Sequence, residues 1–361
     1  MRLVSPLLKR VVYPGLAQIG YLRRHTRGQL CVVTYHGVRP AGYRDIDPDL
    51  DGSLVSGPML RLQIRLLKSH YSVVTPDQFL RWIQRKAELP PRALLLTCDD
   101  GLKNTLTEML PVLRDEGVSC LFFITGGSAG DTLQMLWYEE LYLMLLQTPP
   151  GLLEVEELGV RVSLRGRDER RKIWLAMVKS LSRVDSGRRS VLMEQVRKQC
   201  GLAEDWQSAY WNDSARRSRF GLLNANEVRE LVASGMSIGA HTLSHPMLSH
   251  ASDEVARGEI SASRSVLEQA FGVRIWALAY PFGDATSVTA REMKMADEAG
   301  FECAFVNYGG GFGAELPVFA LPRVHVTAEM SLGEFEAHVS GFHRRLRRLG
   351  QQEAASVAQG G

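Results

Sequence analysis

The segment Ala93-Leu94-Leu95-Leu96-Thr97-Cys98-Asp99-Asp100-Gly101 places two adjacent carboxylates at the end of a largely apolar run. Such a run is typical of a strand that is buried on both faces of a parallel sheet. The glycine permits a tight exit from the strand. One carboxylate would serve as the N-cap of a helix that is predicted to begin near Leu102. Capping needs only one acid, so the pair indicates either a capped helix with an incidental neighbour or a site of chemistry.

Further strand-like runs alternate with segments of helical periodicity along the chain. This alternation predicts parallel βαβ units of the α/β class, which a chain of this length can close into a (β/α) barrel. The predicted strands are 31–36, 93–98, 119–125, 236–240, 275–280, 303–307 and 319–326, and the predicted helices are 57–69, 76–87, 102–116, 224–234, 252–271, 287–299 and 331–348.

One region interrupts the alternation. Residues 152–164 have the pattern of two short strands around Gly159, and the charged stretch that follows is helical. We expect a mainly helical insertion that acts as a lid or substrate-binding subdomain, or that is a purely structural excursion. Trp137-Tyr138 at its start would either stack on a ring of a bound ligand or be buried. The expected organisation is an amphipathic segment at 1–29, a barrel formed by 30–136 and 222–348, the insertion at 137–221, and a flexible tail at 349–361.

The composition of the 361 residues is that of a folded globular protein, with 45% hydrophobic and 23% charged residues. A net charge of only +3, without a recognition helix or a basic aromatic groove, argues against a nucleic-acid partner. The five cysteines are odd in number and widely spaced, which argues against a disulfide framework. No leader-like or bilayer-length apolar segment is visible, so we expect a cytoplasmic protein.

Residues 1–27 qualify that expectation because apolar side chains recur there at helical spacing beside basic ones. Such a segment is either an interfacial helix, which would make the protein peripheral to the inner membrane, or a helix packed across the barrel. The apolar positions are Leu3, Leu7, Leu8, Val11, Val12, Leu16 and Ile19, and the basic ones are Lys9, Arg10, Arg23, Arg24 and Arg27.

Two histidines, His241 and His245, follow the predicted strand 236–240. At a spacing of four residues they would share one face of a helical turn, which is metal-ligand spacing, although two surface histidines are the plain alternative. The carboxyl ends of parallel barrel strands meet on one face. An aspartate from strand 93–98 would therefore complete a His-His-Asp set that leaves positions open for water and substrate.

These residues resemble the polysaccharide deacetylases of the NodB-homology type, also called carbohydrate esterase family 4. The T-F-D-D-G motif of that family corresponds to 97–101, with Cys98 in place of the aromatic residue, and its H-[ST]-x-x-H motif corresponds to 241–245. Its proline-aromatic-glycine loop corresponds to 280–283. Within the family the chain is most similar to bacterial members that begin with Tyr-His, here Tyr35-His36, and end with Leu-Pro-Arg, here 321–323. The resemblance covers 30–136 and 222–326 and implies a distorted, seven-stranded (β/α) barrel of the NodB-homology type.

The resemblance also implies roles. Asp100, His241 and His245 would bind a divalent metal, by default Zn²⁺, with Co²⁺, Ni²⁺ or Mn²⁺ able to substitute. Asp99 would be the general base, and the backbone N–H of Phe282 would stabilise the oxyanion.

The general acid stays open between His36 and His325, because the family's usual Leu-x-x-His has no clean counterpart here. Many members hold the base with an arginine ahead of the proline loop, where this chain has Ala279. Arg323 would take over that task, or would form a structural salt bridge.

The function expected from these features is hydrolysis of a carbon-nitrogen, non-peptide bond: removal of N-acetyl groups from a sugar of a cell-surface polysaccharide or its precursor. The partner is an acetylated carbohydrate. An O-acetyl carbohydrate esterase and a non-catalytic carbohydrate-binding relic of the fold are the alternatives. Retention of both the ligands and the base argues against the relic.

Overall fold

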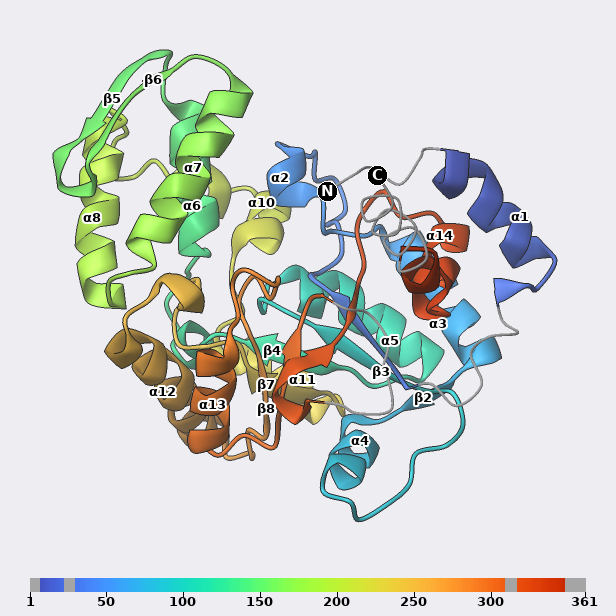
Figure 1. Ribbon diagram of the computed structural model, residues 1–361. Coiled ribbons are helices and arrows are strands. Elements are labelled where there is room, and N and C mark those ends of the chain that lie inside the picture. Colours follow the sequence, from blue (N-terminus) through green and yellow to red (C-terminus); the bar gives the residue numbers. More distant parts are fainter. Residues whose placement is uncertain (1–6, 23–29, 309–316, 348–361) are drawn as a thin grey trace, which may run out of the picture.

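The computed structural model describes residues 7–22, 30–308 and 317–347, and within them a parallel sheet curls into a nearly closed barrel surrounded by helices (Figure 1). The hydrogen-bonded order is β10-β9-β8-β7-β4-β3-β1-β11, and β2 joins β3 from outside this path. The strands are β1 (Cys31–Tyr35), β2 (Ser72–Val74), β3 (Ala93–Cys98), β4 (Leu121–Ile124), β7 (Ser237–Ala240), β8 (Ala277–Ala279), β9 (Cys303–Val306), β10 (Leu321–Pro322) and β11 (Val324–His325).

One short segment joins the two edges of this sheet. β10 pairs with β9 and β11 pairs with β1, and only Arg323 separates the two strands. They are the two halves of the predicted strand 319–326, so each of the seven predicted strands is present and the predicted (β/α) barrel is confirmed. The prediction missed β2, because three residues are too short to show a period.

Local sequence signals explain most of the surrounding helices. Thr75 and Gln78 form a capping box at the start of α4, and Gly117, with a φ of 64°, ends α5. The predicted helix 102–116 is divided into a π-helical turn, Thr105–Met109, and α5, because Pro111 cannot donate a backbone hydrogen bond. The barrel helices are α2 (Pro48–Asp51), α3 (Gly57–His70), α4 (Pro76–Ile83), α5 (Leu110–Glu116), α11 (Ala225–Ala233), α12 (Asp253–Phe271), α13 (Ala290–Glu298) and α14 (Leu332–Val339).

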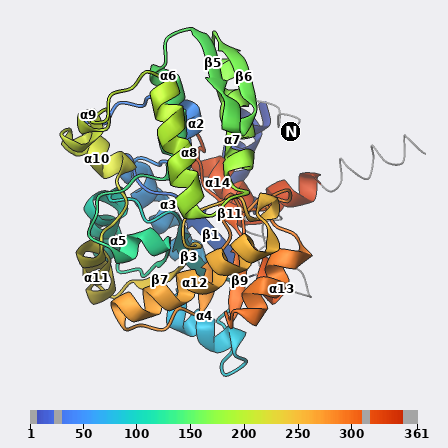
Figure 2. The same cartoon turned by 90° about the vertical axis from the view of Figure 1, so that its left-hand side faces the viewer.

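The region between β4 and α11 forms a layer of its own beside the barrel (Figure 2). Its two predicted strands form an antiparallel hairpin that turns at Gly159, where φ is 61°. Buried side chains such as Tyr142, Trp174 and Val196 give it a separate apolar cluster. Its elements are α6 (Trp137–Gln147), β5 (Gly151–Val155), β6 (Val160–Leu164), α7 (Arg167–Leu181), α8 (Ser186–Gln199), α9 (Ser208–Trp211) and α10 (Ser214–Phe220).

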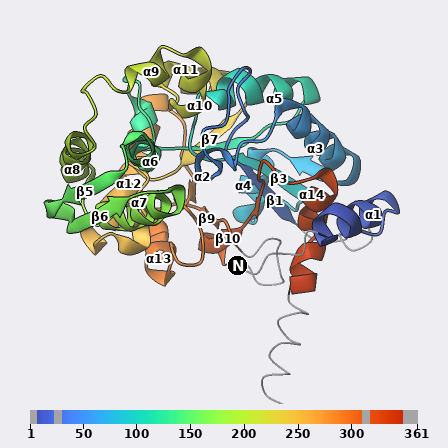
Figure 3. The same cartoon turned by 90° about the horizontal axis from the view of Figure 1, so that it is seen from above.

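The N-terminal helix α1 (Tyr13–Gln18), with the preceding π-turn η1 (Leu8–Val12), lies beside α14 (Figures 1 and 3). Tyr13 is buried there, while Leu7, Val11 and Ile19 are each more than half exposed. The helix therefore packs on the barrel through one side and presents apolar side chains on the other. The predictions for 1–6, 23–29 and the tail 349–361 lie outside the described residues. No helix in the described ranges is both long enough and apolar enough to cross a membrane.

Candidate active site

Every predicted site residue lies at or just beyond the carboxyl end of a barrel strand. His36 follows β1, the two aspartates follow β3, His241 and His245 follow β7, and Phe282 follows β8. Because the paired strands are parallel, these ends share one face of the barrel. The structure therefore brings residues together that lie more than two hundred positions apart in the chain.

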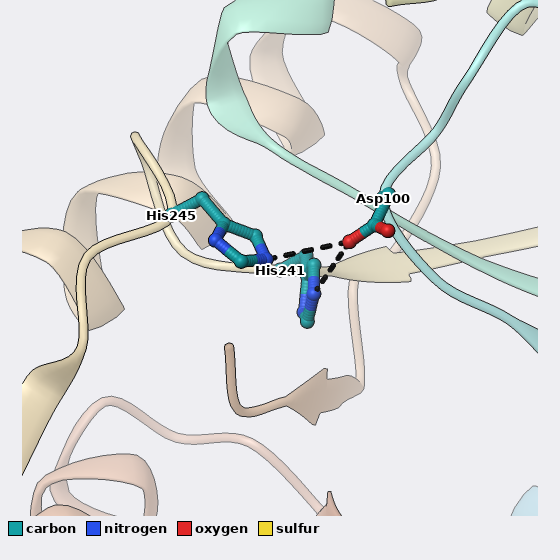
Figure 4. Close-up of side chains that lie close together, drawn as sticks. All are labelled: Asp100, His241 and His245. Carbon is teal, nitrogen blue, oxygen red and sulfur yellow. Dashed lines mark ion pairs between the residues drawn. The ribbon is translucent and has the colours of Figure 1, made fainter. Parts of the chain in front are cut away.

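Asp100, His241 and His245 converge on one point (Figure 4). The Oδ1 atom of Asp100 lies 3.3 Å from the Nε2 atom of each histidine, and all three side chains are buried. The Nδ1–H of His241 donates to the carbonyl oxygen of Ala279 at 2.7 Å. This bond leaves Nε2 of the neutral ring as a lone pair that faces the carboxylate.

That arrangement fits a metal ion. Ligands held at about 2.0–2.2 Å around a tetrahedral zinc ion lie roughly 3.3–3.6 Å apart, and the observed spacing between Asp100 and each histidine is 3.3 Å. Burial raises the pKa of Asp100, but the close contacts with His241 and His245 outweigh it and hold the pKa well below its ordinary value. The set therefore offers one anionic oxygen and two imidazole nitrogens from one side.

The two histidines do not lie on a helical turn, and that prediction is wrong. Residues 241–247 are irregular, and Thr242 and His245 both have left-handed backbones, with φ of 62° and 60°. The backbone N–H of His245 donates to Oγ1 of Thr242 at 3.0 Å, and Gly126 donates its N–H to the Thr242 carbonyl at 3.0 Å. This bent loop, not a helix, makes the imidazoles converge.

Asp99 is fully buried and is held by Arg323 through two hydrogen bonds of 2.7 and 2.6 Å. The arginine is itself fully buried, and its guanidinium lies over the rings of Phe123 and Phe305. Burial raises the pKa of Asp99, but the nearby charge of Arg323 outweighs it and lowers the pKa below its ordinary value. The contact expected between Arg323 and the base carboxylate is therefore present.

Both candidates for the general acid lie at this end of the barrel. The Nε2 atom of His36 is 3.8 Å from Oδ2 of Asp99, and the ring centroids of His36 and His325 are 4.6 Å apart. Burial, reinforced by the nearby His36, lowers the pKa of His325 to about 3. Arg323 and His325 both reach the site, as the alternation of side chains along a strand predicts.

The proline loop makes a tight turn beside the histidines. The Gly283 N–H donates to the Pro281 carbonyl at 2.7 Å, and Phe282 between them has a φ of 62°. This is a strained three-residue turn. The Phe282 ring lies 5.2 Å from that of His245, and its backbone N–H donates to no acceptor within the described residues.

Comparison with known proteins places the chain in a family. The family model described as polysaccharide deacetylase matches residues 86–170 and 195–304, more than half of the chain. This chain belongs to the polysaccharide deacetylase family. The resemblance inferred from the motifs is thereby confirmed.

A curated relative, YxkH of Bacillus subtilis, bears the family name polysaccharide deacetylase and is 25% identical over 120 residues. That alignment covers 33% of this chain and 42% of the relative, so the chain spans less than half of the relative's length.

Solved structures with the same fold include the deacetylase PplD of Streptococcus pyogenes, at 15% identity and a TM-score of 0.54, covering 87% of this chain and 99% of that one. IcaB of Ammonifex degensii is 16% identical in sequence with a TM-score of 0.52, and the match covers 86% of this chain and 97% of IcaB. A de-N-acetylase of Aggregatibacter actinomycetemcomitans is 14% identical in sequence with a TM-score of 0.52, and the match covers 86% of this chain and 99% of that protein.

Helix α6 brings two aromatic residues to this candidate site that the motifs did not assign to it. The Tyr138 ring lies 4.9 Å from that of His245 and 5.4 Å from that of Phe282. The Nε1–H of Trp137 donates to the His245 carbonyl at 3.0 Å. No local pattern could have located them, because the contact joins residues about a hundred positions apart.

A second missed group lies beneath a small cavity of about 80 Å³ that reaches Asp100 and His36. Arg219 is fully buried at this cavity and bonds to Asp51 and to both carboxylate oxygens of Glu139. The sequence gave no sign that Arg219 is buried, because it is a charged residue near the end of a polar helix.

Proposed function

We propose that this chain is a metal-dependent hydrolase that removes N-acetyl groups from a hexosamine in a cell-surface polysaccharide or its precursor. The observation that carries the proposal is the convergence of Asp100, His241 and His245 next to an Arg323-bound carboxylate, Asp99. Membership of the polysaccharide deacetylase family supports an acetylated carbohydrate as the substrate.

Asp100, His241 and His245 would hold the metal. Zinc, a redox-inert ion, suits a hydrolytic site with two imidazoles and one carboxylate, and cobalt, nickel or manganese would substitute. A divalent ion there supplies Lewis acidity to the acetyl carbonyl and to the attacking water. The Ala279 carbonyl fixes the His241 ring through Nδ1, which orients Nε2 toward the ion.

Asp99 would take the proton of the attacking water. Its paired hydrogen bonds to Arg323 keep the carboxylate ionised and fix its orientation, while lone pairs remain for the water. The unused N–H of Phe282 would donate to the oxygen that becomes negative as the acetyl carbon turns tetrahedral. Tyr138 and Phe282 pack around His245 and would restrict water there.

His36 is our candidate for protonating the leaving amine. It lies beside Asp99, whereas a His325 with a pKa near 3 holds no proton to give at neutral pH. If His325 were the acid instead, its change to glutamine would abolish turnover while the same change at His36 would not.

An O-acetyl ester substrate is the second candidate. The same residues serve ester hydrolysis, and an alcohol leaves more readily than an amine, so an ester depends less on the acid. The similarity in fold to a protein described as a de-N-acetylase favours the amide. A non-catalytic relic is disfavoured because it needs neither the converging ligands nor the Arg323-bound base.

We also propose a peripheral contact with the inner membrane, made from the cytoplasmic side. The apolar side of α1 and its flanks, at Leu7, Val11 and Ile19, faces away from α14. The five cysteines are buried free thiols, as is usual in a reducing compartment. Sedimentation with anionic vesicles tests the contact: changing the three apolar residues to serine should abolish it, and unchanged sedimentation would reject it.

Acetate release tests the proposed function. The chain is stripped of metal and assayed on N-acetylated and O-acetylated glycans, before and after addition of Zn²⁺, Co²⁺, Ni²⁺ or Mn²⁺. We expect release only with metal and faster release from the N-acetylated set. Undiminished release from stripped protein would exclude metal dependence, and release from esters alone would favour the second candidate.

A further inference from the structure

The ring of Tyr138 is fixed beside the predicted metal ligand His245. Its centroid lies 4.9 Å from that of His245, with the two planes 34° apart, and 5.4 Å from that of Phe282. The rings of Trp137 and Trp174 lie 6.2 and 6.5 Å from it. With four aromatic rings packed around the phenol ring, the part of the side chain left for other contacts is its hydroxyl end.

The hydroxyl of Tyr138 is free. Its oxygen forms no hydrogen bond to a described residue, and it is not enclosed, whereas the hydroxyl of Tyr142, one turn further along α6, is. Tyr138 is also partly exposed and lines the small cavity of about 80 Å³. A phenylalanine would pack against His245 equally well. Packing therefore explains the ring but not the accessible hydroxyl.

The small cavity lies next to the groups assigned to the reaction. Asp100, a predicted ligand, and His36, the candidate acid, line it together with Tyr138. A cation lines it too, but each of the three side-chain nitrogens of Arg219 already donates to an acceptor of the protein. The phenol, unlike the guanidinium, is thus free to donate to a substrate.

Deacetylation creates a negative charge that needs such a donor. As water adds to the acetyl carbon, the carbonyl oxygen gains charge, so a hydrogen bond to this oxygen is stronger in the transition state than in the bound substrate. A tyrosine has an ordinary pKa near ~10 and keeps its proton at neutral pH. The backbone N–H of Phe282 would be one donor, and the hydroxyl of Tyr138, whose ring contacts that of Phe282, offers a second.

We propose that Tyr138 is a further catalytic residue, whose hydroxyl donates a hydrogen bond to the acetyl oxygen as it becomes negative. The phenol keeps its proton throughout: the proton of the attacking water goes to Asp99, and His36 protonates the leaving amine. The inference rests on the proposed function for the identity of the acetyl group, and on the ring contacts and the cavity for the position of the hydroxyl.

Two variants on one helix test the hydroxyl. Tyr138→Phe keeps the ring and removes only the oxygen. Tyr142→Phe is the matched control, because Tyr142 stacks on Trp174 at 4.7 Å and does not line the cavity. Acetate release is measured on the β-1,4-linked or β-1,6-linked tetramer of N-acetylglucosamine, whichever reacts faster. Tyr138→Phe should lower kcat by about ten- to a hundredfold and leave KM unchanged, because the bond forms only in the transition state. Tyr142→Phe should change neither.

Methylphosphonate tests the same contact without turnover. It carries a methyl group and anionic oxygens on a tetrahedral atom, as the transition state does, so a group that stabilises the transition state also stabilises its complex. Calorimetry on the zinc-loaded chain should give a Kd about tenfold higher in Tyr138→Phe and an unchanged Kd in Tyr142→Phe. The affinity for Zn²⁺, measured by competition with a chelator, should be the same in both, because the ring remains against His245.

An unchanged kcat in Tyr138→Phe, or a rise in KM alone, would overturn the proposal, since the hydroxyl would then be idle or would bind only the ground state. Equal methylphosphonate affinity in Tyr138→Phe and the control, or no binding to the unsubstituted chain, would overturn it as well. Failure of the proposed function would appear separately, as absence of acetate release from every glycan by the unsubstituted, metal-loaded chain. The titration would then decide on the hydroxyl by itself.

Discussion

At the residue scale, the site depends on backbone conformations that its residue types do not predict. Asp100, Thr242, His245 and Phe282 all have left-handed φ values between 60° and 73°. Each such conformation costs about 1–2 kcal/mol in a non-glycine residue, so the surrounding contacts must stabilise it. The motifs therefore predicted which residues meet, but not the bent loop that makes His241 and His245 meet. Contacts of that loop with Gly126 and Glu259, which lie outside the motif, hold its shape.

Thr242 tests this view of the loop. Its Oγ1 accepts the His245 backbone N–H, so Thr242→Val should remove that bond and weaken metal binding by up to about tenfold, the equivalent of one buried hydrogen bond. Thr242→Ser keeps the hydroxyl and should retain affinity. Competition titration with a metal chelator measures both; equal affinities in the two variants would show that the bond does not position His245.

Variants of Asp99 and Arg323 test whether the arginine stabilises the fold mainly through its ion pair with Asp99. Both side chains are fully buried, so Arg323→Gln leaves a buried carboxylate unpaired and should cost roughly 3–5 kcal/mol of unfolding free energy. Asp99→Asn together with Arg323→Gln should recover part of that loss. Urea unfolding of the single and double variants gives the coupling. Additive losses would mean that the two residues stabilise the fold independently.

At the scale of elements, α6 connects the helical layer to the candidate active site. Trp137 and Tyr138 open this helix and contact His245, and Arg219 ends the layer beside the small cavity. We propose that 137–221 is an insertion that sets substrate choice. Exchange of residues 147–213 between family members keeps these three contacts and should move the glycan profile while metal binding is unchanged. An unchanged profile would support a purely structural excursion.

Helix α14 carries a pH-dependent contribution to stability. The His338 ring stacks on that of His343 at 4.0 Å, with Glu334, Lys9 and Arg347 nearby, and burial lowers the pKa of His338 to about 3. Because an unfolded histidine titrates near ~6.5, the unfolded chain binds the proton first as the pH falls. The contribution is thus present above pH ~6.5 and is lost progressively below it. His338→Gln should flatten the fall in Tm between pH 7 and 5, and an unchanged slope would contradict this.

At the scale of the whole molecule, the hydrophobic periodicity and the polar residues at strand ends, together with the family's motifs, were enough to predict the barrel and the face that bears the site. Runs such as 93–98 are largely apolar, and each is followed by a polar residue or a tight turn, so both signals are local. The closure of the sheet at Arg323 and the burial of Arg219 were not predictable. They depend on packing between elements far apart in the chain, such as Arg219 against Glu139, which no local pattern specifies.

The central claim divides two adjacent acids between two tasks: Asp99 as base and Asp100 as metal ligand. The structure is consistent with that division, because Asp99 faces Arg323 and Asp100 faces the histidines. Asp99→Asn should therefore retain metal but lose roughly 10²–10⁴ in turnover, since an amide cannot accept the proton of water. Asp100→Asn should lose metal affinity itself, because it removes the anionic ligand.

Parallel measurement of metal affinity and single-turnover acetate release in Asp99→Asn and Asp100→Asn tests the account most directly. It predicts near-normal metal affinity with slow release for Asp99→Asn, and weakened metal affinity for Asp100→Asn. Loss of metal from Asp99→Asn with retention in Asp100→Asn would reverse the assignment. Full activity in either variant would contradict the mechanism.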